Sequence, residues 1–84
     1  YLVAKEDIQK LSREIKETIR LAIEKKLVKS PEVFGRPLRK SLRGYRKLRI
    51  GDYRVVFKIQ KETVYILLIA HRSIVYKEIY KRIG

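Results

Sequence analysis

The chain has 84 residues, with 22 basic and 9 acidic side chains and a net charge of +13. A chain of this length forms one domain, spanning 1–84, that buries about 60–65% of its unfolded surface. It has no cysteine, which excludes disulfides and thiolate metal sites, and its single His71 makes no metal site alone. No apolar run reaches the roughly 20 residues that span a bilayer. No signal peptide is visible, although a Tyr1 start is compatible with a trimmed leader, so we expect a cytoplasmic protein without a membrane partner.

The basic residues are concentrated in the second part of the chain. Residues 1–35 carry eight basic and six acidic side chains, a net of +2, whereas residues 36–84 carry fourteen and three, a net of +11. Such a field favours a polyanionic partner, either a nucleic acid or an acidic protein. A mixture of positive and negative side chains would keep the protein soluble equally well. A need for solubility therefore explains the excess of positive charge less well than a polyanionic partner does. Abundant Lys, Arg, Glu and Ile with no Asn, Cys or Met is typical of proteins from hot environments.

The N-terminal part of the chain predicts a short strand followed by helix. Residues 1–4 are apolar and β-prone, as in an edge strand whose start is missing. Ser12 can cap a helix, so both one long helix and a helical pair fit the region from about residue 5 to residue 29. Apolar residues recur there at steps of three and four, as on one face of an amphipathic helix: Ile8, Leu11, Ile15, Ile19, Ala22, Ile23 and Leu27.

Residues 31–44 are expected to form a basic connection. Ser30-Pro31 ends the helix, because the residue before a proline avoids the helical region. The segment holds both prolines and two of the four glycines. Its cations predict contacts with an RNA backbone that carry no sequence preference, or a surface that binds a protein partner. These cations are Arg36, Arg39, Lys40 and Arg43.

Residues 45–70 predict a meander of antiparallel strands, and the C-terminal segment, 71–84, has a helical pattern. Gly51-Asp52 suits a tight hairpin turn between the first two strands. In the strand from residue 53 to residue 59, odd-numbered residues are apolar and form one face. Val64–Ala70 is almost wholly apolar, as expected of a central strand covered on both faces. The predicted fold class is therefore α+β.

Several polar side chains of this meander are expected at one end of the sheet. In an up-down-up arrangement, the end of the first strand, the start of the second and the end of the third lie together. Guanidinium groups and a phenol around a small hollow would form a phosphate clamp. The residues that can converge there are Arg49, Arg54, His71, Arg72 and Tyr76.

The sequence offers no paired carboxylates, no Ser-His-Asp set and no metal-ligand cluster for other kinds of hydrolysis. Chemistry at the clamp would therefore be phosphoryl transfer assisted by cations. RNA supplies its own nucleophile, the 2′-OH. A site that aligns this group with the adjacent phosphate and neutralises the developing charge needs neither a metal nor a cofactor.

Two runs, LRGYRKLRIGDYRVVFKI and VYILLIAHRSIVY, resemble the RelE toxins of bacterial and archaeal toxin–antitoxin pairs. With the helical region and PEVFGRPLR, the likeness covers most of the chain. It implies a RelE-like fold, with an N-terminal helical pair packed on a curved antiparallel sheet and a short C-terminal helix. It also implies metal-independent cleavage of mRNA in the ribosomal A site, beside 16S rRNA, which inhibits translation. The implied partner is a RelB-like antitoxin, with the toxin a monomer alone and part of a hetero-oligomer when bound.

The resemblance also assigns roles to individual residues. Arg54 of the GDYR run and Arg72 of the HR pair would stabilise the transition-state phosphate. Tyr76 would orient or stack on the nucleotide and assist proton transfer. Lys47 and Arg49 match basic strand residues, one of which is a proposed general base in some members.

Other residues match the family less closely. His71 corresponds to a histidine whose role varies among members, and Ala70 stands where glycine is usual. Arg46 and His71 join the cations of the connection as expected RNA contacts. Simpler interpretations are a surface ion pair for Arg54, core packing for Tyr76 and a structural hydrogen bond for His71.

Two further functions remain open from the sequence. A ParE-like toxin would share the fold and poison DNA gyrase without cutting RNA, but its members generally lack the Arg/Arg/Tyr set. A basic RNA-binding module without catalysis would show strongly salt-dependent binding and no cleavage.

Overall fold

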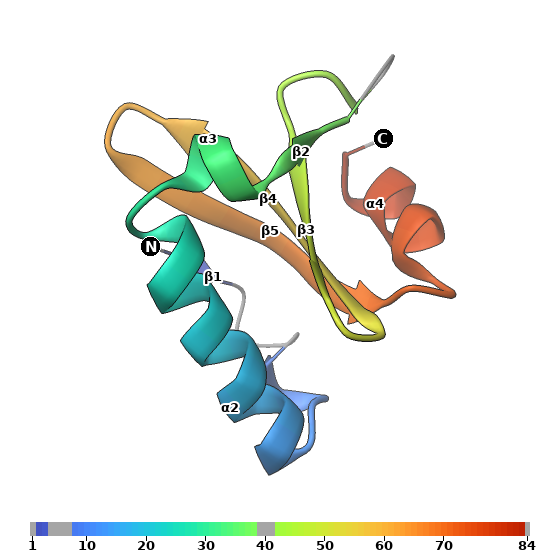
Figure 1. The fold of residues 1–84 in the computed structure, drawn as a ribbon. Coiled ribbons are helices and arrows are strands. Elements are labelled where there is room, and N and C mark those ends of the chain that lie inside the picture. The colour runs from blue at the N-terminus through green and yellow to red at the C-terminus, as the bar shows by residue number, and fades with distance from the viewer. Residues whose placement is uncertain (1, 4–7, 39–41, 84) are drawn as a thin grey trace.

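The computed structural model describes the backbone of residues 2–3, 8–38 and 42–83, which forms an α+β fold (Figure 1). The sheet has five strands in the order β1-β5-β4-β3-β2. The antiparallel meander of β3, β4 and β5 is confirmed, whereas the parallel pairing of β1 with β5 was not predicted. The elements are β1 (Leu2–Val3), α2 (Arg13–Ala22), the π-helical segment η1 (Ile23–Leu27), α3 (Pro31–Phe34), β2 (Arg36–Pro37), β3 (Arg46–Ile50), β4 (Tyr53–Gln60), β5 (Thr63–His71) and α4 (Val75–Ile83).

The helical region is interrupted at Ser12, as one of the two predicted arrangements requires. The Ser12 side chain caps α2, since its hydroxyl oxygen accepts a hydrogen bond from the backbone N–H of Ile15 at 3.3 Å. A single turn precedes it, in which the Leu11 N–H donates to the carbonyl of Ile8. Residues 5–7, with which the first member of the predicted pair begins, lie outside the described residues.

The π-helical segment η1 follows from the spacing of the buried side chains. Ile15, Ile19, Ile23 and Leu27 are four residues apart, and an α-helix of 3.6 residues per turn rotates such a series by about 40° per step. The Val28 N–H donates to the carbonyl of Ile23, five residues earlier. This wider turn offsets part of the rotation and keeps Leu27 fully buried against the sheet.

Residues 31–44 are more ordered than the predicted connection. Pro31 begins α3, because the first helical position needs no N–H donor. Gly35 then lies so close to the buried Phe57 ring that a Cβ atom there would clash with it. Beyond Gly35, β2 pairs with β3 through Arg36 opposite Lys47. A two-residue strand is too short to show an alternation of polar and apolar side chains, which explains why β2 was not predicted from the sequence.

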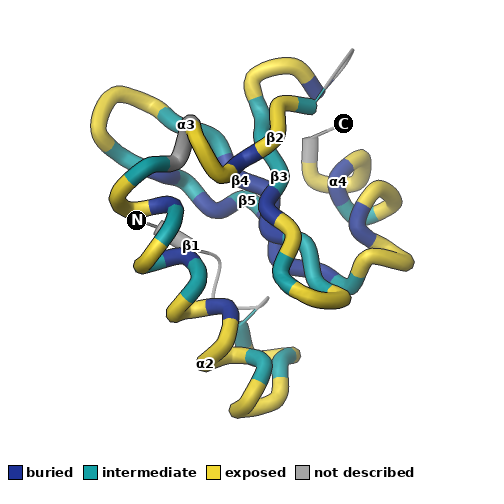
Figure 2. The backbone as a smooth tube through the Cα atoms, viewed as in Figure 1, coloured by how far each residue is buried: buried dark blue, intermediate teal, exposed yellow. Residues whose placement is uncertain are grey.

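Two apolar cores lie on the two faces of the sheet, and Figure 2 shows the buried backbone running along its central strands. One core packs beneath α2 and η1, and the other beneath α4. Strand β5 contributes side chains to both cores, because its pairing with β4 shifts by one residue. Val56 pairs with Leu68, whereas the next residue, Phe57, pairs with Ile66. Leu67 is therefore the extra residue of a bulge, which reverses the alternation of side chains along β5. The Arg82 guanidinium of α4 donates to the Leu67 carbonyl at 2.7 Å.

The Gly51-Asp52 turn was predicted correctly, and the helical pattern of residues 71–84 corresponds to α4. Gly51-Asp52 links β3 and β4 as a two-residue turn, with Gly51 at a φ of +58° that favours glycine. Lys61-Glu62 makes the next hairpin turn. Within the described part of the chain, no helix is both long and apolar enough to cross a membrane.

Candidate nucleic-acid interface

Four cations gather on the α4 side of the sheet because of how the strands pair. Arg49 lies opposite Arg54, and Arg36 lies opposite Lys47. Cross-strand partners point to the same face of a sheet. Lys47 also pairs with Val56 of β4, which packs in the core beneath α4, so these cations lie on the α4 side. This group, called here the basic face, consists of Arg36, Lys47, Arg49 and Arg54. The predicted convergence of Arg49 with Arg54 is therefore found.

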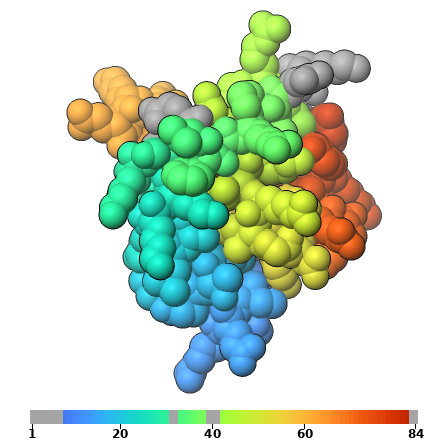
Figure 3. Space-filling view, in the orientation of Figure 1, coloured from blue at the N-terminus to red at the C-terminus, as the bar shows by residue number. Residues whose placement is uncertain are grey.

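Two neighbouring hollows open along the basic face. The first, the Phe34 hollow, has a volume of about 370 Å³, and the second, the tyrosine hollow, about 350 Å³. The Phe34 hollow is lined by Lys26, Phe34, Arg36, Lys47, Leu48, Arg49 and Arg54. The tyrosine hollow is lined by Arg36, Pro37, Leu38, Leu42, Lys47, Tyr76 and Tyr80. Figure 3 shows this region, with the β3–β4 hairpin (yellow) between the α2–η1 helix (blue to teal) and α4 (red).

Lys47 and Tyr76 form a polar contact between the sheet and α4, besides the one from Arg82 to Leu67. The Lys47 Nζ donates to the Tyr76 Oη at 2.9 Å and lies 5.1 Å from the centre of its ring. Val75 and Ile79 bury the inner face of α4, which leaves Tyr76 and Tyr80, four residues apart, exposed together on its outer face. Tyr76 is therefore not a core aromatic, and it joins the basic face through Lys47.

Arg54 and Arg72 lie at the same end of the sheet, each held to the β3–β4 turn. The Arg54 Nη1 donates to the carbonyls of Gly51 and Tyr53, both at 2.9 Å. The backbone N–H of Arg72 donates to the Asp52 carbonyl at 2.8 Å, and its Nε lies 3.8 Å from the Asp52 carboxylate. Both members of that ion pair are exposed, so it is weak. Arg54 lines the Phe34 hollow, whereas Arg72 is not among the described residues that line it.

His71 does not join this group, because its register partner Tyr53 packs on the α2 side of the sheet. The two rings meet edge to face, with centroids 5.6 Å apart. The His71 Nδ1 accepts from the Ser73 N–H at 3.1 Å and also contacts the Ser73 hydroxyl at 2.8 Å. The predicted convergence fails for this residue, since the end of a strand fixes the edge a side chain reaches but not the face.

The expected RNA contacts outside the basic face are scattered. Arg46 points to the α2 side, opposite Phe57, and its Nη1 donates to the Gly35 carbonyl at 2.9 Å. Arg43 is exposed in the turn before β3. Arg39 and Lys40 lie outside the described residues.

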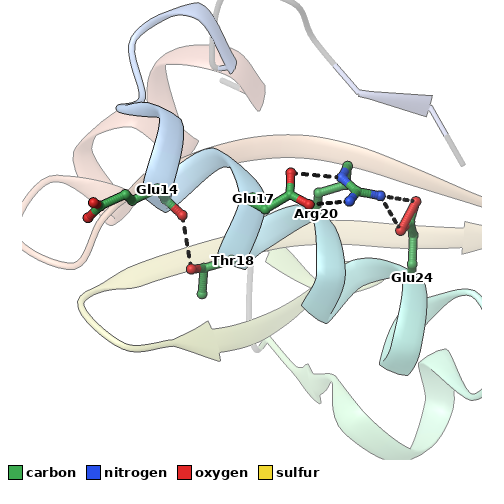
Figure 4. Close-up of polar contacts among 5 residues, drawn as sticks. All are labelled: Glu14, Glu17, Thr18, Arg20 and Glu24. Carbon is green, nitrogen blue, oxygen red and sulfur yellow. Dashed lines mark hydrogen bonds and ion pairs between the residues drawn. The ribbon is translucent and has the colours of Figure 1, made fainter.

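Acidic side chains of α2 and η1 form a separate network on the helix surface (Figure 4). Arg20 bridges Glu17 and Glu24, and its Nη1 donates to both Glu24 oxygens at 3.0 and 2.8 Å. The hydrogen bond from Arg20 holds the pKa of Glu17 below its ordinary value of 4.5, and Glu17 in turn raises the pKa of Arg20. The Thr18 hydroxyl donates to the Glu14 carbonyl at 3.0 Å. Among the described side chains, no carboxylate lines either hollow of the basic face, so its positive field is not neutralised locally.

Among the cationic and aromatic residues of the hollows, three were not predicted from the sequence, namely Lys26, Phe34 and Tyr80. Lys26 belongs to η1, and its Nζ lies 5.7 Å from the centre of the Phe34 ring. The four-residue spacing of Tyr76 and Tyr80 indicates that both rings lie on one face of a helix, so Tyr80 could have been predicted with Tyr76. Lys26 and Phe34 gave no such signal, because their place depends on how η1 and α3 pack beside β3.

Comparisons with known proteins agree with this architecture. Residues 3–76 match the family model described as the ParE toxin of type II toxin–antitoxin system, parDE. The toxin RelE of Mycobacterium tuberculosis (strain ATCC 25618 / H37Rv) is 37% identical over 76 residues, which cover 88% of this chain and 78% of that protein.

Two solved structures share the fold. The toxin–antitoxin complex RelBE2 from Mycobacterium tuberculosis contains a chain that superposes with a TM-score of 0.77 at 32% identity, over 86% of this chain and 90% of that one. The RelB–RelE antitoxin–toxin complex from Methanococcus jannaschii gives a TM-score of 0.70 over 93% and 98% of the two chains, at 23% identity, and supports the fold alone. With the family match over most of its length, this chain belongs to the RelE/ParE-type toxins of type II toxin–antitoxin systems.

Proposed function

We propose that this toxin is a metal-independent endonuclease that cuts mRNA in the ribosomal A site and so inhibits translation in the cytoplasm. The observation that carries the proposal is the pair of cationic hollows joined at Lys47, whose Nζ contacts the Tyr76 hydroxyl. A cluster of cations beside a proton-sharing pair fits the needs of RNA cleavage by an internal nucleophile.

In the proposed reaction, the 2′-OH of one nucleotide attacks the adjacent phosphorus, and the bond to the 5′ oxygen of the next nucleotide breaks. Lys47, in its deprotonated amine form, takes the proton of the 2′-OH, and the Tyr76 hydroxyl gives its proton to the departing 5′ oxygen; a proton passed from Lys47 to Tyr76 along their hydrogen bond restores both groups. The products are a 2′,3′-cyclic phosphate and a 5′-OH. Arg54 and Arg49 stabilise the extra negative charge on the phosphate oxygens in the transition state, and Arg72, at the same end of the sheet, adds to the positive field there.

Binding to the ribosome relies on the excess positive charge of residues 36–84. Fourteen basic and three acidic side chains leave a net of +11 there, which attracts both mRNA and 16S rRNA. The complexes of related proteins suggest a RelB-like antitoxin as the protein partner, and the toxin alone is expected to be a monomer. The exposed side chains of Arg36 and Arg43 are available to either partner.

The test is cleavage of a defined mRNA on programmed ribosomes. Loss of one charge-stabilising donor typically lowers the rate on the order of 10²–10³-fold, so Arg54→Ala and Arg72→Ala should each fall by about that factor. Lys58→Ala is the matched control, because Lys58 lies on β4 like Arg54. Its side chain contacts the Tyr65 ring and is not among the described residues that line either hollow. Equal cleavage by the wild type and the Arg54→Ala/Arg72→Ala protein would reject the proposal.

A second candidate function is poisoning of DNA gyrase. The observation that favours it is the family model itself, which is named for the ParE toxin. Inhibition of gyrase supercoiling, with mRNA left intact on the ribosome, would promote this alternative. The basic face would then contact DNA or an acidic surface of the enzyme.

A further inference from the structure

The two hollows of the basic face share a common plan. Each combines cations with an exposed aromatic ring, which is Phe34 in one and Tyr76 with Tyr80 in the other. They also share two lining residues, Arg36 and Lys47, which are cross-strand partners on β2 and β3. The shared cations therefore form a ridge between two aromatic surfaces.

We propose that the Phe34 hollow is a nucleobase-stacking subsite, and that RNA crosses the Arg36–Lys47 ridge with one phosphate on the ridge and one nucleotide in each hollow. The nucleotide on the α3 side stacks on Phe34, and its neighbour lies against Tyr76 and Tyr80. This inference rests on the proposed function, and it adds Phe34 as a residue that positions the substrate.

Phe34 is held in place although its side chain is 43% exposed. Its backbone N–H donates to the Ser30 carbonyl at 3.3 Å. The next residue, Gly35, packs on the Phe57 ring, and its carbonyl accepts from Arg46 at 2.9 Å. A solvent-accessible ring on an anchored backbone has few torsions to lose when a base stacks on it, and such stacking contributes about 1–3 kcal/mol per base.

The surroundings of the ring favour a nucleotide over an apolar protein segment. Lys26 lies over the Phe34 ring, and Arg49 and Arg54 line the same hollow, so a phosphate would be bound next to the stacked base. The neighbouring apolar residue Val33 is 75% exposed but is not among the described residues that line either hollow. A protein surface that used Phe34 as an apolar anchor would be expected to use Val33 as well.

The experiment measures binding of a 2′-O-methyl RNA hexanucleotide, which cannot be cut, to the full chain. The chain has no Trp, so Phe34→Trp gives one fluorescent reporter at the hollow. Its emission should be quenched when the RNA binds. Phe34→Ala should weaken binding about 5- to 150-fold, which is the stacking contribution expressed as a ratio of dissociation constants. Val33→Ala, the control on the same short helix, should bind like the wild type.

A matched change in the RNA separates stacking from a general loss of affinity. An abasic nucleotide placed in turn along the hexanucleotide should, at one position, weaken wild-type binding by the same factor and leave Phe34→Ala unaffected. Unchanged binding by Phe34→Ala, or a loss that is the same at every abasic position, would overturn the inference.

Failure of this inference can be told apart from failure of the proposed function. If the wild type cleaves mRNA on ribosomes and Phe34→Ala cleaves with the same KM, the stacking subsite is wrong and the nuclease stands. If the wild type does not cleave but binding depends on Phe34 and on one base, the subsite stands and the nuclease is wrong. If Phe34→Ala and Val33→Ala both bind RNA like the wild type, no base stacks on Phe34 and the inference falls.

Discussion

The contact between Lys47 and Tyr76 gives a quantitative test of the geometry at the basic face. Tyr76→Phe removes the hydroxyl and keeps the ring, whereas Lys47→Met removes the charge and keeps an unbranched side chain. The Lys47 Nζ lies 2.9 Å from the hydroxyl and 5.1 Å from the ring centre, so the first change breaks one contact and the second breaks both. The double variant should therefore be less destabilised than the sum of the single variants.

The expected coupling follows from the exposure of the pair. A hydrogen bond contributes a net of about 0.5–1.5 kcal/mol, and the 46% exposure of Tyr76 places this one in the lower half of the range. We expect a coupling free energy of about 0.5–1 kcal/mol, which corresponds to roughly 2–8 °C in Tm for a domain of this size. Lys47→Met should destabilise further by about 0.5–1 kcal/mol, because it also loses the cation–π contact.

Urea unfolding of the wild type, both single variants and the double variant measures this coupling. Tyr80→Phe combined with Lys47→Met is the matched control, because Tyr80 lines the same hollow one turn further along α4. That control pair should be additive within about 0.3 kcal/mol. Additivity of Lys47→Met with Tyr76→Phe would refute the geometry from which the proton-sharing role is argued.

Two further predictions concern the scaffold of the site. Gly35→Ala should destabilise by about 1–3 kcal/mol in urea unfolding, because the added methyl meets the buried Phe57 ring and overpacking outweighs the entropic gain of alanine; stability equal to the wild type would contradict the close packing. Ser12→Ala should lower stability by about 1 kcal/mol through loss of the cap of α2, while Ser12→Asp should retain it. Identical Tm values for Ser12→Ala, Ser12→Asp and the wild type would show that the cap is not used.

The sequence was most informative where a period or a turn set the backbone. Gly51-Asp52 fixed the register of the hairpin, and that register alone places Arg49 opposite Arg54. The amphipathic stripe likewise identified Ile19, Ile23 and Leu27 as the helix face that packs on the sheet. In both cases a local rule determines the neighbours in space.

The remaining parts of the site depend on long-range packing that no local rule contains. The bulge at Leu67 reverses the faces that side chains reach on its two sides along β5. Counting alternate residues along this apolar run therefore cannot reveal the bulge or assign the faces. His71 was expected beside Arg54 because both lie at one end of the sheet, but the end of a strand does not fix the face, and His71 lies on the other one. Phe34 reaches the basic face because Gly35 allows the chain to pass over Phe57, a contact between residues distant in sequence.

The bulge in β5 also bears on how chains of this kind can change length. Deleting one residue from Thr63–Ile66 would move the hydrophobic side chains before Leu67 to the opposite face of the sheet, and inserting one would do the same. An insertion between Lys61 and Glu62 leaves every pairing of the strand untouched, because both residues lie in an exposed turn. Variation among natural relatives, and the attachment of labels or tags, should therefore be tolerated at this hairpin and excluded from the strand that follows it.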